Sequence, residues 1–252
     1  MWRSGKIMNA RHALMAFTGI VALCGSATVQ AAAAKPAAKP AAKAPTPAPA
    51  PVIAPEIKTA LDRMGNALRA LRVYEVKADV TIEDVLVTGQ KLQSSMALTI
   101  DVKYPDRLYM DANAAHKHRM IYYDGKQITV YGPKTGYYAS VAAPPTTRET
   151  ITVLHDKYGF ETPLADLFTW GTPTFPVERI KSAMSAGTDI INGKTCEHYA
   201  FRQEGADWQL WIDKEGPGLP CKLLITDTED PAHPQTTSVM TWNTSIALED
   251  SR

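Results

Sequence analysis

The chain has 252 residues, and its 27 Lys and Arg nearly balance its 26 Asp and Glu, so the formal net charge is +1. Residues 1–55 hold six basic residues and no acidic one, which leaves the other 197 residues with a net charge of −5. An acidic body argues against a nucleic-acid-binding protein, which needs a basic surface. Three Cys in this length exclude a disulfide scaffold, and 45% hydrophobic residues predict a folded domain.

Residues 1–31 have the parts of a secretory signal peptide. Three basic residues precede an apolar stretch at 13–23 that is too short to span a bilayer comfortably. The Val-Gln-Ala ending predicts cleavage after Ala31. Two alternatives stay open. Cys24 would be the lipid-bearing residue of a lipoprotein, although Leu23 stands where a small residue is needed, or the segment would remain as an uncleaved anchor.

Residues 32–55 are rich in Ala, Pro and Lys and cannot build a core, so we predict a disordered linker. Its extended, polyproline-like chain reaches at most ~75 Å. We interpret it as a passive spacer. The alternative is a tether whose three Lys contact anionic lipid head groups or the cell wall. The remaining residues, 56–252, are predicted to form one domain.

The domain begins with one amphipathic helix and continues in long strands. After Pro55, apolar residues recur at helical spacing as far as Arg72. From Tyr74 the period changes to two, so that every second residue over 74–82 is apolar, and Leu92, Met96, Leu98, Ile100 and Val102 repeat this spacing. This alternation indicates half-buried strands with one face toward water.

Turn signals divide the rest of the chain into further strands. Asp124-Gly125 and Asn192-Gly193 each predict a tight hairpin. Looser Gly-containing turns, such as Gly216-Pro217-Gly218, separate the other strands, and the last strand is expected over 236–246.

A helical insert is expected between the two halves of the sheet. Thr146 and Glu149 fit a capping box at the start of its first helix. Thr162-Pro163 is expected to begin a shorter second helix, and residues 176–184 a third.

The expected order is one helix, about eleven antiparallel strands and a central helical insert. The absence of strand–helix–strand alternation in the sequence argues against a parallel sheet. Because a flat sheet of so many strands is unstable, it must curl. We therefore predict an α+β fold, in which a curled antiparallel sheet forms an unclosed half-barrel. The N-terminal helix and the central insert are expected to lie on its concave face.

Several motifs carry a resemblance to a known family. The run Asp207–Asp213, with Cys196–Arg202 before it and Pro220–Leu223 after it, resembles the predicted periplasmic proteins called domain of unknown function 2092. The shorter pieces Pro105–Leu108 and Tyr123–Lys126 are similar to motifs of the same family.

The resemblance covers most of residues 56–250 and extends to the lipoprotein carriers LolA and LolB, which bind acyl chains inside an unclosed, helix-covered barrel. It implies a LolA-like fold, export to the periplasm of a Gram-negative bacterium, and a hydrophobic ligand. It does not imply lipoprotein transport itself, and it brings no defined site residues.

The concave face is the predicted ligand site, for a lipid, an acyl chain or another apolar molecule. Met and aromatic side chains offer a soft, adaptable apolar surface for such a ligand. The alternative is that the helices fill the interior completely. The residues expected to line the site are Val76, Val80, Ile82, Met96, Leu98, Ile100, Leu108, Met110, Met120, Tyr122, Trp208 and Leu210.

Two tryptophans lie three residues apart in one strand, so they face opposite ways. Trp208 shares its face with Leu210 and is expected inside. Trp211 is expected outside, where it either packs across strands or contacts a partner or the membrane.

A disulfide between Cys196 and Cys221 stays open at this point. Both cysteines would remain after export to an oxidising compartment, which favours the bond. The meander, however, places them two strands apart, near 10 Å between Cα atoms against a limit of about 7 Å. A bulge or a frayed strand end would bring them closer.

No motif for catalysis or for metal binding stands out in the sequence. His116 and His118 lie two apart, but no acidic or Cys partner has a telling spacing, so we predict no metal site and no cofactor. We interpret His155 as structural and expect His198 on the water-facing side of its strand; a hydrolase acting through these two residues is the third-ranked alternative.

We therefore predict a non-catalytic periplasmic binding or carrier protein for a hydrophobic ligand, with no nucleic-acid partner. The alternative is an envelope scaffold or chaperone that contacts another protein through Trp211, a sheet edge and the linker. Peripheral contact with the membrane stays open in either case.

Overall fold

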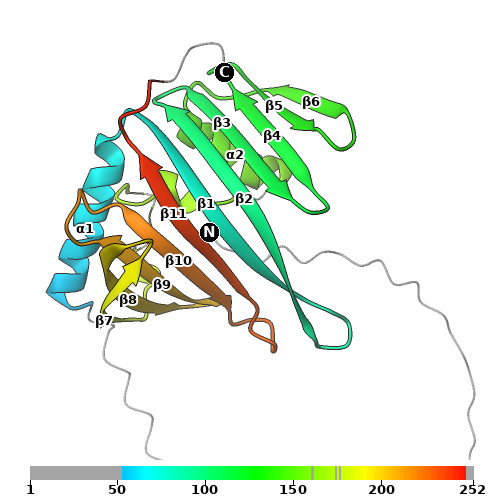
Figure 1. The fold of residues 1–252 in the computed structure, drawn as a ribbon. Coiled ribbons are helices and arrows are strands. Elements are labelled where there is room, and N and C mark those ends of the chain that lie inside the picture. Colours follow the sequence, from blue (N-terminus) through cyan, green and yellow to red (C-terminus); the bar gives the residue numbers. More distant parts are fainter. Residues whose placement is uncertain (1–52, 160–161, 174, 176, 248–252) are drawn as a thin grey trace, which may run out of the picture. The chain divides into compact units, whose positions relative to one another are not determined.

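A computed structural model describes residues 53–247 of the chain, except 160–161, 174 and 176 (Figure 1). The predicted signal peptide and nearly all of the predicted linker lie outside the described residues, so their assignments remain predictions.

The described strands form one antiparallel sheet in the order β6-β5-β4-β3-β2-β1-β11-β10-β9-β8-β7 (Figure 1). The strands are β1 (Val73–Val85), β2 (Lys91–Lys103), β3 (Arg107–Ala114), β4 (His118–Tyr123), β5 (Gln127–Gly132), β6 (Tyr137–Ala142), β7 (Ser182–Ile191), β8 (Lys194–Gln203), β9 (Ala206–Asp213), β10 (Pro220–Asp227) and β11 (Gln235–Asn243). Strands β1 to β6 follow one another from the middle of the sheet to one edge, and strands β11 to β7 follow one another from the middle to the other edge. The first and last strands therefore pair in the middle. The sheet does not close, and β6 and β7 are its two edges. This confirms the predicted unclosed antiparallel sheet.

Two α-helices lie on one side of this sheet. Helix α1 (Pro55–Ala70) begins with Pro at its first turn and buries one apolar face. Helix α2 (Thr147–Tyr158) begins with the predicted capping box, in which the Thr146 hydroxyl accepts a hydrogen bond from the Glu149 backbone N–H at 3.3 Å. It ends at Gly159, whose φ of 60° is the left-handed conformation common after helices.

The rest of the insert differs from the prediction. The expected second helix is a short 3₁₀ helix, η1 (Ala165–Phe168), and only a 3₁₀ turn, η2 (Val177–Arg179), lies within 176–184. The predicted third helix is wrong, because the residues from Ser182 onward form β7 and pair with β8. The Asn192-Gly193 hairpin explains this outcome. Its φ values of 49° and 77° suit a tight two-residue turn, which holds β7 against β8.

Strands β1 and β2 pair without interruption from Val73–Lys103 to Val85–Lys91. Because side chains alternate between faces, the even-numbered residues of both strands lie on the same side of the sheet. That side packs against the helices and forms the main hydrophobic core. The hairpin extends beyond both helices (Figure 1).

Candidate functional site

The apolar side chains of the concave face come from neighbouring strands in register. Val76 pairs with Ile100, and Ile100 with Met110, so the three side chains lie in one row on the same face. Burial is complete here, with 0% exposure for all three. The structure brings together on this face Val76, Val80, Ile82, Met96, Leu98, Ile100, Leu108, Met110, Trp208 and Leu210. Their contact with a ligand stays a prediction.

The prediction that Met120 and Tyr122 line the concave face is wrong. In β4 the residues that pair with Leu108 and Met110 are Tyr123 and Ile121, and these are the buried ones. Met120 and Tyr122 therefore point to the convex side, where the Tyr122 hydroxyl donates a hydrogen bond to the Met120 sulfur at 3.7 Å. Because Met120–Tyr123 contains no charged residue, the alternation of polar and apolar residues does not show which of its side chains face the core. An assignment that is wrong by one residue moves every side chain to the opposite face of the sheet.

Side chains of the helices and the insert cover the centre of the concave face. Met64 of α1 and Ile151 of α2 are buried against it, and so are Phe168 and Trp170 of the insert. The centre is thus a packed core, as the alternative of a filled interior predicts. A ligand at the centre would have to displace some of these side chains.

The cover does not reach the far end of the sheet. Along β2 the inward-facing residues change from Leu98, which is 2% exposed, through the partly buried Met96 and the exposed Ser94 to Leu92, which is 56% exposed. On β1, Val80 is buried and Ile82 is partly buried. This apolar track, defined by Val80, Ile82, Leu92, Met96 and Leu98, extends from the core along the projecting hairpin. The polar Ser94 and Asp84 on the same face separate Leu92 from its other members.

The insert is held on α1 by a contact between two glycines. A Cβ atom added to Gly65 would lie 2.5 Å from the Gly171 Cα, so the two backbones approach too closely for any larger residue. Gly171 has a φ of 71°, which an L side chain rarely adopts. The buried Trp170 precedes it and enters the core. The glycine contact thus fixes where the insert crosses α1.

A surface groove that the sequence did not reveal lies beside α1. It has a volume of about 570 Å³ and its lining combines one stripe of the helix with Pro217 of the β9–β10 loop. Arg63 at this groove forms a 2.6 Å ion pair with Glu197 of β8. The lining residues are Thr59, Asp62, Arg63, Asn66, Ala67, Ala70, Leu71 and Pro217. Only the tertiary placement of the loop creates this groove.

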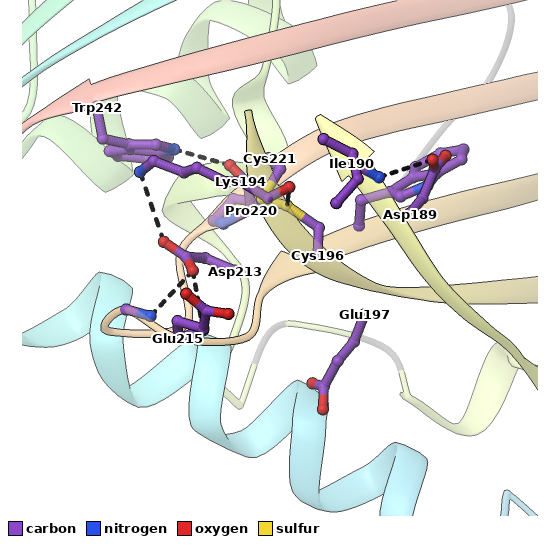
Figure 2. The surroundings of a disulfide bond; sticks show 12 residues. Asp189, Ile190, Lys194, Cys196, Glu197, Asp213, Glu215, Pro220, Cys221 and Trp242 are labelled. Carbon is purple, nitrogen blue, oxygen red and sulfur yellow. Dashed lines mark hydrogen bonds and ion pairs between the residues drawn. A yellow bond between two sulfur atoms is a disulfide. The ribbon is translucent and has the colours of Figure 1, made fainter. Parts of the chain in front are cut away.

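Cys196 and Cys221 form a disulfide, which decides the question that the sequence left open (Figure 2). Their Cα atoms are 6.8 Å apart, less than the two regular strand spacings expected from the meander. The pairing of β10 with β9 shifts between Pro220 and Lys222, so a bulge breaks the alternation at Cys221. Cys221 consequently joins Cys196 in a small apolar cluster on the convex side.

Trp211 belongs to the same convex cluster, so it lies on the predicted face of the sheet. It is only 4% exposed, however, so the prediction that it contacts a partner or the membrane is wrong. The His198 ring stacks on it with centroids 4.0 Å apart, and the Lys222 ammonium lies 4.5 Å from its ring centroid. Its indole N–H donates to Asp189 at 3.2 Å. These neighbours cover both the faces and the edge that a partner would contact.

The remaining histidines do not assemble a metal site. His118 contacts Asp111 at 2.8 Å, whereas His116 lies in the turn before β4. No group of three His, Cys, Asp or Glu able to hold a metal occurs among the described residues. Among the side-chain hydrogen bonds found in the described part of the chain, the His155 ring contacts only the neighbouring Asp156, at 2.9 Å.

Burial affects two tyrosines strongly. It raises the pKa of Tyr109 to about 12, with the nearby Asp111 carboxylate as the second cause. Burial, followed by the neighbouring Tyr104, raises the pKa of Tyr74 well above its ordinary value. Both hydroxyls therefore stay protonated at physiological pH.

Comparison with known proteins agrees with this architecture. The profile of one family, described as "Predicted periplasmic protein (DUF2092)", matches residues 58–252. A search of curated proteins finds no match. No helix in the described part of the chain is long and apolar enough to cross a membrane.

Solved structures with a similar fold share little sequence with this chain. Lipoprotein LppX of Mycobacterium tuberculosis is 12% identical, with a TM-score of 0.51 over 78% of this chain and 100% of LppX. LprF of Mycobacterium bovis is 14% identical, with a TM-score of 0.46 over 80% of this chain and 99% of LprF. An uncharacterised conserved protein from Thermus thermophilus is 8% identical, with a TM-score of 0.45 over 77% of this chain and 90% of that protein. At this identity the likeness to LppX shows a shared fold.

Proposed function

Given that the chain belongs to the DUF2092 family of predicted periplasmic proteins, we propose that it is a non-catalytic periplasmic protein that binds a lipid, an acyl chain or another apolar molecule. The ligand lies between the concave face and the helices. The residues that would contact it first are Ile82, Met96 and Leu92, at the open end of the apolar track.

The observation that carries this proposal is that the apolar track extends beyond the part of the sheet that the helices cover. A core alone explains why Val80 and Leu98 are apolar, because both are buried. It does not explain why Ile82 and Met96, which are only partly buried, and the exposed Leu92 are apolar on the same face. Ser94 and Asp84 show that polar residues are tolerated there. A ligand that enters at the hairpin and slides inward would cover this surface.

The interior also has the chemistry that an apolar chain requires. Met96 and Met110 are unbranched and adapt to irregular shapes. The described residues hold no metal cluster, and the histidines lie outside this face. These surroundings suit an apolar chain, and His155 and His198 are not among the residues that would contact it.

Native mass spectrometry of the protein purified from its own envelope tests the proposal directly. We expect a co-purifying lipid or apolar molecule that is released by organic solvent. A protein that carries nothing and fails to bind a dansyl-labelled undecanoic acid would contradict the proposal.

A pair of variants locates the site. Ile82→Trp places a bulky ring on the apolar track, and we expect at least a tenfold weaker binding of the labelled acid. Thr81→Trp is the matched control, because Thr81 is the adjacent residue of β1 and faces the opposite side. Equal affinities of the two variants for the labelled acid would exclude the track as its entry.

A further inference from the structure

Strand β6 forms an edge of the sheet that lacks the usual protection. Its sequence, Tyr-Tyr-Ala-Ser-Val-Ala, contains no charged residue and no Pro, and its pairing with β5 is regular from end to end. Tyr137 and Tyr138 are 80% and 74% exposed. Natural edge strands usually carry charges, Pro or bulges that prevent pairing with another chain. An edge without any of them is suited to such pairing.

The other edge of the same sheet shows the contrast. In β7 the pairing shifts between Ser185 and Gly187, which is a bulge. One of its outward-directed backbone N–H groups is occupied by a side chain, since that of Ile190 donates to the Asp189 carboxylate at 2.7 Å. Strand β7 is thus protected against pairing with another chain, whereas β6 is not, and this difference between the two edges requires an explanation.

The pattern of hydrogen bonds shows which groups of β6 are available. The backbone N–H of Ala143 donates to the Lys126 carbonyl at 2.8 Å, so these two residues form a hydrogen-bonded pair. In an antiparallel ladder such pairs alternate with pairs that exchange no bonds. Tyr138, Ser140 and Ala142 consequently direct their N–H and C=O groups away from β5.

We propose that β6 pairs antiparallel with β6 of a second copy of this chain, about a twofold axis at Ser140, to form one sheet that runs through both copies. In this register Ser140 meets Ser140 of the second copy, and Tyr138 meets its Ala142. All outward N–H and C=O groups of the three residues then find partners. The pairing is isologous, as a twofold dimer requires.

The side chains fit the same register. On the convex face the ring of Tyr138 lies over the small Ala142 of the second copy, and on the other face Val141 lies beside Ala139. Because β6 carries no charge, the twofold axis brings no like charges together. A slip by two residues in one direction sets Tyr138 against Pro144, which has no N–H to donate. The register centred on Ser140 avoids this mismatch.

Thiol crosslinking tests the register. Cys196 and Cys221 are joined and Cys24 lies in the predicted signal peptide, so in the exported, cleaved protein Ser140→Cys introduces the reactive thiol. Paired Cα atoms would be about 5.5 Å apart across the twofold axis, within reach of a short bis-methanethiosulfonate reagent. Thr129→Cys is the matched control. It pairs with Ser140 on β5, one strand inward, so its two copies would be about 15 Å apart. We expect a covalent dimer from Ser140→Cys alone. Equal crosslinking of both variants, or of neither, would overturn the proposal.

Sedimentation velocity of the protein purified from the periplasm gives the second test. Ser140→Lys would set two ammonium groups against each other at the axis, and we expect at least a tenfold weaker dimer. Thr188→Lys, on the exposed edge β7, should leave the dimer unchanged. A wild-type protein that stays monomeric at high concentration would overturn the proposal. So would a dimer that Ser140→Lys leaves intact, or the capture of an extended peptide of another protein by β6 in place of the second copy.

Discussion

Gly65→Ala gives a sharp test of how the insert is held on α1. Gly65 lies in the interior of the helix, where Ala alone would stabilise the helix by about 0.5–1 kcal/mol. The structure predicts the opposite sign. The new Cβ would lie 2.5 Å from the Gly171 Cα and 3.0 Å from its backbone nitrogen. Both are backbone atoms, which cannot turn aside as a flexible side chain can, so α1 or the insert must move.

The expected loss follows from these two opposing effects. Overpacking of a tight contact costs about 1–3 kcal/mol, and part of it is offset by the helix propensity of Ala, which leaves a net loss of about 1–2 kcal/mol. For a domain of this size the midpoint of thermal unfolding, Tm, should fall by about 2–8 °C. Differential scanning calorimetry measures this shift.

Asn66→Ala is the matched control for Gly65→Ala. Asn66 is the neighbouring residue of the same helix and is exposed, so its replacement should leave Tm within about 1–2 °C. A rise of Tm in Gly65→Ala would refute the reasoning, because it would mean that only helix propensity acts at this position. If Tm falls as expected, stopped-flow mixing with dansyl-labelled undecanoic acid should show faster association, since a displaced insert uncovers more of the concave face.

Three further outcomes are expected. The double replacement Cys196→Ser with Cys221→Ser should lower the free energy of unfolding by about 3–4 kcal/mol in a urea titration, because the bond closes a loop with a sequence separation of 25; an unchanged midpoint would show that the bond does not form. Gly193→Ala should cost about 1–2 kcal/mol in thermal unfolding, since a side chain at a φ of 77° is strained. The raised pKa of Tyr109, about 12, means that the folded state keeps a proton which the unfolded state loses near pH 10. Stability should therefore fall as pH rises from about 10 toward 12, and less steeply in Tyr109→Phe when urea unfolding is followed across that range; equal slopes would contradict the assignment.

Much of the fold was accessible from local patterns. The alternation in β1 and β2 predicts both strands and the inward side of Val80 and Leu98, because every second residue is polar. The capping box at Thr146 and the hairpin at Asn192 depend on side chains and dihedral angles within a few residues, so short sequence signals suffice for them as well.

The wrong predictions concern residues whose face or burial depends on neighbouring strands, which local sequence patterns do not show. Met120 and Tyr122 lie in a segment without charged residues, and only the register of β4 with β3 assigns their face. Trp211 was correctly placed on the face opposite Trp208, but its burial depends on His198 and Lys222 from the adjacent strands. Alternation in a single strand shows the direction of a side chain and not what covers it.

By itself, the sequence determined the succession of strands and hairpins, the first helix, and the family resemblance that implies export to the periplasm, because these depend on neighbouring residues. Tertiary structure decided the rest. It brought Cys196 within reach of Cys221 through a bulge, and it placed Gly65 against Gly171. It also left Leu92 uncovered at the end of an apolar track. Each of these depends on contacts between residues far apart in the chain, and such contacts exist only when the whole sheet and its cover are assembled.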